Sequence, residues 1–228
     1  MAKPPARTSS SQDIQAFLGT AKAVAVFAER HPRLVFAIDA TASREPTWAI
    51  ARDRQAAMFH SAGQVASLSI QLCYYRGFHE FRASPWLSDS KALAGQMMRV
   101  RCEGGHTQIQ RLLRHALAVH RETPLRGLVF IGDALEESPD EVCHLAGQCG
   151  LRKLPLFLFQ EGADSAVQRT FQSMARLSGG AWARFDQHSA DTLSDLLGAV
   201  ARYATGGRAA LENHPGQGAK LLLQQLKP

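Results

Sequence analysis

The sequence predicts an α/β fold with a mostly parallel central sheet, and three observations lead to this prediction. Short continuous apolar runs, such as residues 34–38 and 128–131, are rich in β-favouring residues and typical of strands buried on both faces. Stretches of about 12 to 18 residues with helical periodicity separate most of these runs. Residues that favour turns and helix caps lie between the two kinds of segment. Strands that alternate with helices in this way form a parallel sheet covered on both faces.

The first half of the chain contains three of the expected strands. A polar, flexible tail over residues 1–12 leads into a helix expected from Asp13 to about Glu29, and a buried strand follows at Leu34–Ile38. The next helix is expected over residues 46–63, with Pro46 in its first turn. The remaining elements of this half are a strand over 67–75, a short strand over 80–83, a helix over 88–100 capped by Ser88, and a helix over 107–120 capped by Thr107.

The second half continues the alternation of strands and helices. Its expected elements are strands over 128–131, 156–159 and 181–185, and helices over 138–149, 164–177 and 191–203. Together the elements describe a Rossmann-like three-layer sandwich of about six strands, with one short antiparallel edge strand. The domain is expected over residues 13–204. A flexible tail over 205–228 carries a short apolar segment, which either docks on its own domain or is a motif offered to a partner.

Composition narrows the classes of function. The 228 residues suffice for one domain. The net charge of +6 comes from basic residues that are scattered along the chain with few aromatic residues beside them, and this distribution argues against nucleic-acid binding. No apolar run approaches the roughly 20 residues that span a membrane, and the first residues lack the apolar segment of a secretory signal. The four cysteines form no Cys-x-x-Cys pair. We therefore expect a soluble, cytoplasmic protein that does not contact membranes.

Oxygen-bearing side chains follow the ends of the strands at three places. The first strand runs into Asp39-Ala-Thr41-Ala-Ser43, a Gly-Gly loop precedes Thr107, and a later strand ends at Gly-Asp133. In an open parallel sheet, ligands bind at the carboxyl ends of the strands, so these side chains are expected at one edge. Two carboxylates and three hydroxyls are hard oxygen ligands of the kind that Mg²⁺ prefers.

This pattern resembles the metal-ion-dependent adhesion site (MIDAS) of von Willebrand factor A (VWA) domains. The order Asp-x-Thr-x-Ser, then Thr107, then Asp133, with separations of roughly 65 and 25 residues, matches that family over about residues 30–205. The resemblance implies that Asp39, Thr41, Ser43, Thr107 and Asp133 hold Mg²⁺ or Mn²⁺. It also implies that an Asp or Glu of a protein partner completes the metal site, and that the domain is not catalytic.

The sequence departs from the family pattern beside the expected metal. Thr41 and Ala42 replace a Ser and a Gly, charged Arg44 and Glu45 follow, and Ala-Leu-Glu-Glu follows Asp133 in place of an Asp-Gly. Arg44, Glu45 and His106 are accordingly candidates for partner contact. The resemblance is to intracellular bacterial members, which often act as adaptor or assembly factors beside ATPases or chaperones, so we expect a partner of that kind.

Two other interpretations of the same residues remain. Asp, Ser and Thr also favour ordinary turns after strands, and Thr107 could be a helix cap alone. An Asp after an apolar strand followed by a later Gly-Asp also resembles the haloacid-dehalogenase phosphohydrolases. In that reading Asp39 is the nucleophile, and Asp133 with Glu137 holds the metal.

Overall fold

The structure is a computed structural model and describes residues 15, 32–44, 68–185 and 190–226. The helices expected over 13–29 and 46–63 lie outside the described residues, apart from Gln15.

Six strands form one sheet, as the sequence predicts. They are β1 (Arg33–Asp39), β2 (Ser69–Arg76), β3 (Glu80–Leu87), β4 (Gly127–Gly132), β5 (Leu156–Glu161) and β6 (Ala181–Phe185), in the order β3-β2-β1-β4-β5-β6. All neighbours pair in parallel except β2 and β3, so the antiparallel edge strand is confirmed. This edge strand has eight residues and is twice as long as expected, because it pairs with β2 along nearly its full length.

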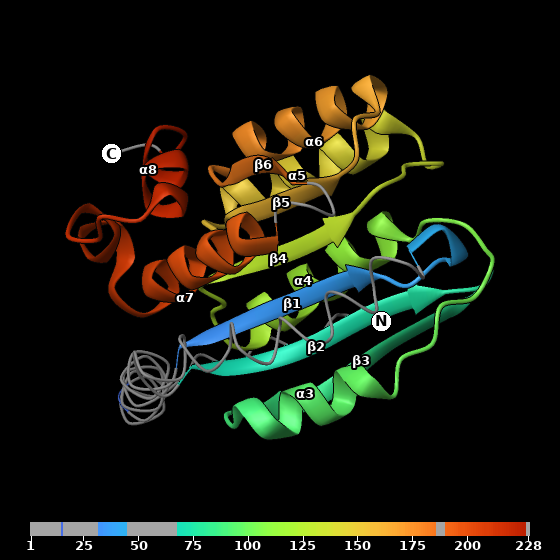
Figure 1. The fold of residues 1–228 in the computed structure, drawn as a ribbon, viewed down its shortest axis with the longest axis horizontal. Helices are drawn as coiled ribbons and strands as arrows, with labels where there is room; N and C mark the ends of the chain where they lie inside the picture. Colours follow the sequence, from blue (N-terminus) through green and yellow to red (C-terminus); the bar gives the residue numbers. More distant parts are fainter. Residues whose placement is uncertain (1–14, 16–31, 45–67, 186–189, 227–228) are drawn as a thin grey trace, which may run out of the picture.

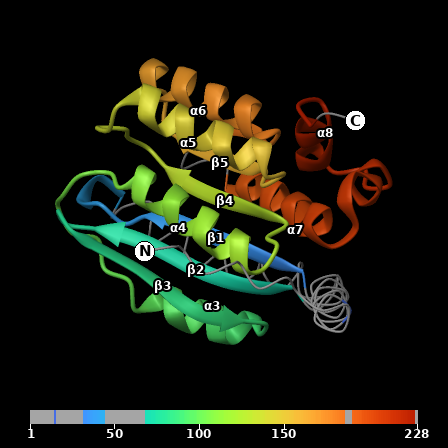
Figure 2. The same ribbon diagram turned by 180° about the vertical axis from the view of Figure 1, so that it is seen from behind.

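Helices cover both faces of the sheet (Figures 1 and 2). They are α3 (Ser90–Met98), α4 (Ile109–Glu122), α5 (Pro139–Leu151), α6 (Ser165–Ser178), α7 (Ala190–Glu212) and α8 (Gln217–Leu223). Alternate residues of β1 enter two separate cores: Val35 packs with α4, α5 and α6, whereas Phe36 packs with α3, α7 and α8. The three-layer sandwich is therefore confirmed, and its two cores explain why the strand sequences are apolar throughout.

The order of the strands places a topological switch point at the end of β1. From β1 the chain passes to β2 on one side, and later enters β4 on the other side. In register, Ile38 of β1 pairs with Tyr74 of β2 and with Ile131 of β4, so the three strands end side by side. Ligands of open α/β sheets bind at such a point.

The cap of α3 differs from the prediction by one residue. Its N-cap is Asp89, whose carboxylate accepts hydrogen bonds from the N–H groups of Lys91 and Ala92, and Ser88 is not the cap. A carboxylate at this position also interacts favourably with the helix dipole, which a serine hydroxyl does only weakly.

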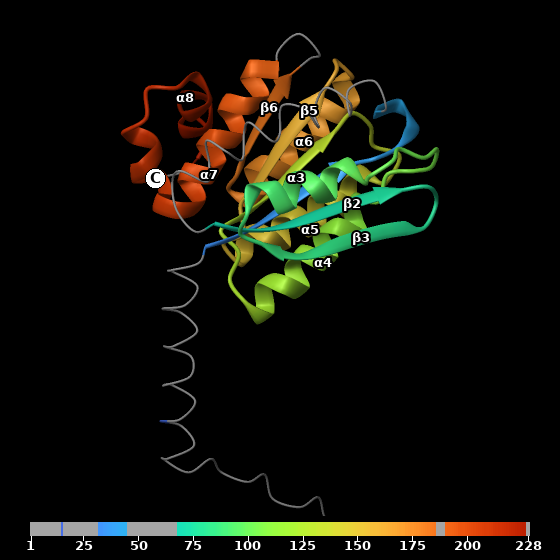
Figure 3. The same cartoon turned by 60° about the horizontal axis from the view of Figure 1, so that its bottom comes forward.

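The C-terminal segment is helical and docked, which corrects the flexible tail expected from residue 205. Helix α7 continues to Glu212 past a kink at Gly207, and α8 packs beside β6 (Figures 1 and 3). The side-chain amide of Gln225 pairs with both backbone groups of Trp182 on the edge strand β6, at 2.9 and 2.8 Å. Of the two alternatives for the apolar segment, the structure shows the docked one.

No helix among the residues that the structure describes has the length and apolar character to span a membrane.

The docking of α8 predicts unequal effects of two adjacent leucines. Leu222 is fully buried in the core, whereas Leu221 is 37% exposed. We expect Leu222→Ala to lower the free energy of unfolding by about 2–4 kcal/mol, and Leu221→Ala by less than about 1 kcal/mol. Urea unfolding followed by circular dichroism measures both. Equal, small effects would contradict a docked C-terminal segment.

Candidate metal centre

Asp39, the last residue of β1, is fully buried, and both of its carboxylate oxygens accept hydrogen bonds. Its Oδ1 accepts from the N–H of Thr41 at 2.8 Å, and its Oδ2 accepts from the hydroxyl of Tyr75 at 3.0 Å. Tyr75 is the residue of β2 that pairs with Asp39 in register. Burial, with a smaller effect of the Asp39 carboxylate, raises the pKa of the Tyr75 hydroxyl well above its usual value. Tyr75 therefore stays protonated and donates to Asp39.

Thr41 and Ser43 lie in the loop that follows β1. Thr41 is buried, its Oγ1 is 3.2 Å from the Oγ of Ser43, and its backbone bridges to Glu103 of the loop before α4. The short helix Ala42–Arg44 turns the chain so that the two hydroxyls meet. The first two of the three predicted loops are thus in direct backbone contact.

Thr107 is buried and paired with Glu136, 29 residues further along the chain. The N–H of Thr107 donates to the Glu136 carboxylate at 2.7 Å, and the N–H of Glu136 donates to Thr107 Oγ1 at 3.1 Å. Thr107 precedes the helix without capping it, since α4 begins at Ile109 and its N-cap position is Gln108. The prediction that Thr107 is the N-cap residue is therefore wrong.

The carboxylate of Glu137 caps α4 from outside the helix. It accepts hydrogen bonds from the N–H of Ile109 and, at 2.9 Å, from the N–H of Gln110. Desolvation raises the pKa of the Glu137 carboxyl, and the hydrogen bonds from Gln110, Ile109 and the Thr107 side chain offset part of this rise. The residue pair Glu136-Glu137 thereby fixes the loop after β4 to the start of α4.

Asp133 follows β4 beside the end of β1. A Cβ atom at the preceding Gly132 would lie 3.6 Å from Cβ of Asp39 and 2.7 Å from the ring of Phe130, so the two strand ends are in close contact. The Oδ1 atom of Asp133 is buried and has no hydrogen-bond partner among the described residues. A buried carboxylate oxygen without a partner is costly, and such an atom is a candidate ligand.

The five predicted oxygen ligands thus lie at the end of β1 and in the loop after it, before α4, and after β4, at one edge of the sheet. Their chemistry fits Mg²⁺ or Mn²⁺, which take oxygen ligands and retain water molecules. A hydroxyl oxygen has two lone pairs, so Thr107 Oγ1 keeps one after accepting from Glu136. Within the described part of the chain, no group of three or more His, Cys, Asp or Glu side chains is suited to a metal. The predicted site contains only two such side chains, Asp39 and Asp133, and its other three ligands are hydroxyls.

The predicted partner-contact residues have different positions. Arg44 ends the short helix after β1, and Glu45 lies outside the described residues. His106 is exposed, and its ring packs edge-on against Phe78 with centroids 5.2 Å apart.

Sequence reasoning missed the positioning roles of Tyr75, Glu136 and Glu137. A signal for Tyr75 was present, because a tyrosine at the end of an otherwise buried strand needs a partner for its hydroxyl. Nothing in the local sequence shows that Glu136 and Glu137 reach Thr107 and α4.

Two observations bear on the phosphohydrolase interpretation. The carboxylate of Asp39 is fully buried and accepts a hydrogen bond at each oxygen, whereas a nucleophile must reach a substrate. Glu137 is hydrogen-bonded to the start of α4. Neither feature favours this interpretation.

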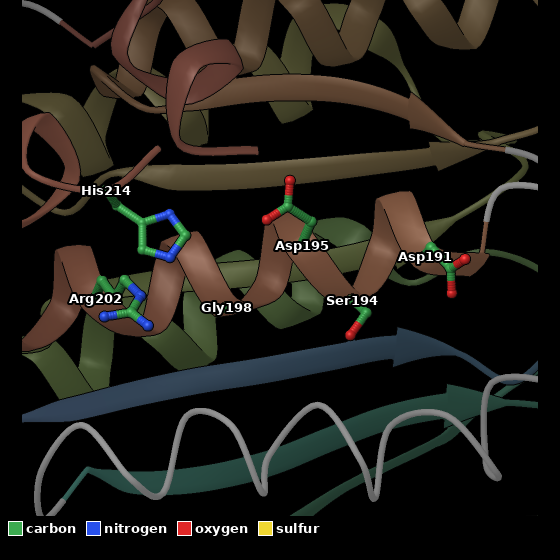
Figure 4. A pocket seen from close by; sticks show the side chains of 6 residues that line it. All are labelled: Asp191, Ser194, Asp195, Gly198, Arg202 and His214. Atoms are coloured by element: carbon green, nitrogen blue, oxygen red, sulfur yellow. The ribbon is translucent and has the colours of Figure 1, made fainter. Parts of the chain in front are cut away.

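A cavity of about 300 Å³ lies elsewhere, along α7 (Figure 4). Its lining contains none of the predicted site residues and consists of Asp191, Ser194, Asp195, Gly198, Arg202 and His214. Two of these side chains hold the C-terminal segment: Asp195 accepts from the N–H of Gly218, and His214 Nδ1 accepts from the N–H of Gly216 at 3.0 Å. We attribute to them a structural role.

Comparison with solved structures identifies the class of fold. The SpRpn10 VWA domain is 12% identical with a TM-score of 0.53, and the match covers 72% of this chain and 95% of that one. An aerotolerance-related membrane protein from Bacteroides fragilis is 14% identical with a TM-score of 0.56, over 75% and 98% of the two chains. The pilus adhesin SpaC from Lactobacillus rhamnosus GG is 9% identical with a TM-score of 0.57, over 75% and 30%. No protein-family model and no curated protein matches the sequence. The fold is that of a VWA domain, as the resemblance implied.

The cap formed by Glu137 predicts a specific loss of stability. We expect Glu137→Ala to lower the free energy of unfolding by about 1–3 kcal/mol, because it leaves two N–H groups at the start of α4 without an acceptor. Glu137→Gln keeps one of the two acceptor oxygens that Ile109 and Gln110 use, so we expect a loss smaller than that of Glu137→Ala. Glu141→Ala, at an exposed position in the first turn of α5, is the control and should change little. Equal stability of the three variants in urea would contradict the assigned cap.

Proposed function

We propose that the chain is a non-catalytic, metal-dependent protein-binding domain that acts as an adaptor or assembly factor. Asp39, Thr41, Ser43, Thr107 and Asp133 would hold Mg²⁺ or Mn²⁺, directly or through water, and a carboxylate of the partner would complete the site. The observation that carries this proposal is Asp133 Oδ1, which is buried with no partner among the described residues and lies at the switch point where β1 and β4 end side by side.

The chain's own residues would orient the ligands in this function. Tyr75 and the backbone of Thr41 fix the carboxylate of Asp39, and Glu136 fixes Thr107 from both its backbone and its side chain. A bound divalent cation would keep a coordination position that the two carboxylates and three neutral hydroxyls do not fill, and an anionic group of the partner could bind there. Binding through such a contact depends on both the metal and an acidic residue of the partner.

The fold supports a role in protein interaction. The structures with this fold include the SpRpn10 VWA domain and a pilus adhesin. The resemblance to intracellular bacterial members supports a cytoplasmic adaptor beside an ATPase or chaperone system.

The proposed site predicts opposite effects of Asp133→Asn on metal affinity and on stability. We expect the affinity for Mn²⁺, measured by electron paramagnetic resonance, to fall at least tenfold, since the variant loses one of two carboxylate ligands. The free energy of unfolding without metal should stay equal or rise, because the buried Asp133 Oδ1 has no hydrogen-bond partner in the described part of the chain to lose. Asp140→Asn, an exposed position in the first turn of α5, is the matched control; it should leave the Mn²⁺ affinity unchanged and lower the free energy of unfolding by less than about 1 kcal/mol.

Two results would contradict the proposal. One is Mn²⁺ affinity that Asp133→Asn leaves intact. The other is release of phosphate from p-nitrophenyl phosphate that is lost in Asp39→Asn, which would instead support a phosphohydrolase with Asp39 as the nucleophile.

A further inference from the structure

Phe78 is an exposed aromatic residue beside the candidate metal centre. It lies in the turn between β2 and β3 with 63% of its surface exposed. Its one aromatic contact among the described residues is with His106, at 5.2 Å between ring centroids and 69° between planes. A single exposed apolar residue is common in proteins, so its meaning depends on how the turn is held.

Backbone contacts hold this turn against the loop before α4. Gly77 has a φ of +56° and its carbonyl accepts a hydrogen bond from the N–H of His106 at 3.3 Å. A Cβ at Gly105 would lie 2.0 Å from the oxygen of Gly77, so only glycine allows the two loops to approach this closely. Phe78 is therefore exposed on a turn that is fixed in place.

The same loop leads into the candidate metal ligands. His106 immediately precedes Thr107, and Glu103 bridges to Thr41. The N–H of Glu103 also donates to the carbonyl of Ala40 at 3.1 Å. The turn with Phe78 and the ligand loops thus form one cluster joined by backbone contacts.

A cationic side chain extends this cluster along the first turn of α4. Arg111 is exposed, donates to the carbonyl of His79 at 2.8 Å, and lies over the ring of Phe81 at 5.4 Å. No ion pair joins it to a carboxylate within the described ranges, whereas Arg76 and Arg82 share Glu80. Arg111 therefore leaves positive charge on the surface beside the turn that carries Phe78 and His79.

We propose that Phe78 and His106, flanked by Arg111, form a docking subsite for an aromatic side chain of a partner protein that lies next to its metal-binding carboxylate. This inference rests on the proposed function, because the carboxylate is the one that completes the metal site. The exposed ring offers an aromatic contact, and Arg111 complements the acidic character of such a segment. A nucleic acid could also stack on Phe78, but a single aromatic does not make a stacking platform, and the carboxylate-binding centre favours a protein.

Two synthetic peptides test the inference. Each peptide has six residues: one Asp, the residue directly after it, and Gly and Ser at the other positions. The residue after the Asp is Phe in one peptide and Ala in the other. The peptides are immobilised at high density, and binding of the protein is measured by biolayer interferometry in the presence of Mn²⁺. We expect the wild-type protein to bind the Phe peptide about fivefold more tightly than the Ala peptide. Phe78→Ala should remove this preference while keeping the affinity for Mn²⁺ alone. Leu151→Ala, at an 88% exposed leucine at the end of α5, should keep the preference.

The outcomes separate this inference from the proposed function. Failure of the wild-type protein to bind Mn²⁺ overturns the proposed function itself. Binding of Mn²⁺ with equal affinity for the two peptides, or with no binding of either, overturns the subsite alone. Binding of an oligothymidylate that Phe78→Ala weakens also overturns it, because the surface would then recognise nucleic acid.

Discussion

The buried carboxylate of Asp39 constrains everything around the strand ends. A charge taken out of water is costly unless hydrogen bonds meet it, and here the Tyr75 hydroxyl and the Thr41 N–H do so. Tyr75 can donate only because β1 and β2 pair in the register that sets it opposite Asp39. The bond from Thr41 in turn bends the chain after β1 so that Thr41 and Ser43 meet. Sheet register and site geometry therefore depend on each other.

The loop after β4 is fixed by different chemistry. Glu136 and Glu137 accept hydrogen bonds from three N–H groups at and before the start of α4, where the helix dipole favours negative charge. They belong to the segment Ala134–Glu137, which follows Asp133 and departs from the VWA pattern, so two residues of this departure have a structural role. The contacts of Glu136 and Glu137 join the loop that carries Asp133 to the segment that carries Thr107. A lone pair of Thr107 Oγ1 and the Oδ1 atom of Asp133 are not used by these contacts.

The sequence predicted the sheet well because a strand buried on both faces is visible in its own residues. Leu34–Ile38 needs no distant information, since each residue packs into one of the two cores. Two features depended on distant contacts and could not be predicted. Glu137 caps a helix that begins 28 residues earlier, and Gln225 secures α8 by pairing with Trp182, 43 residues away. The position of the proposed ligands at strand ends could be predicted from motif spacing, whereas the buried partner of Asp39 required the register of β2.

We propose that Thr107 is a metal ligand as well as a partner of Glu136. The most direct test compares Mn²⁺ affinity in Thr107→Val and Thr107→Ser by electron paramagnetic resonance, with folding checked by circular dichroism. Valine has the shape of threonine without the hydroxyl, and both variants keep the N–H that donates to Glu136. We expect at least a tenfold loss of Mn²⁺ affinity in Thr107→Val and less than about a threefold change in Thr107→Ser. Wild-type affinity in a folded Thr107→Val would contradict it, and would leave Thr107 only the role of holding the loop before α4.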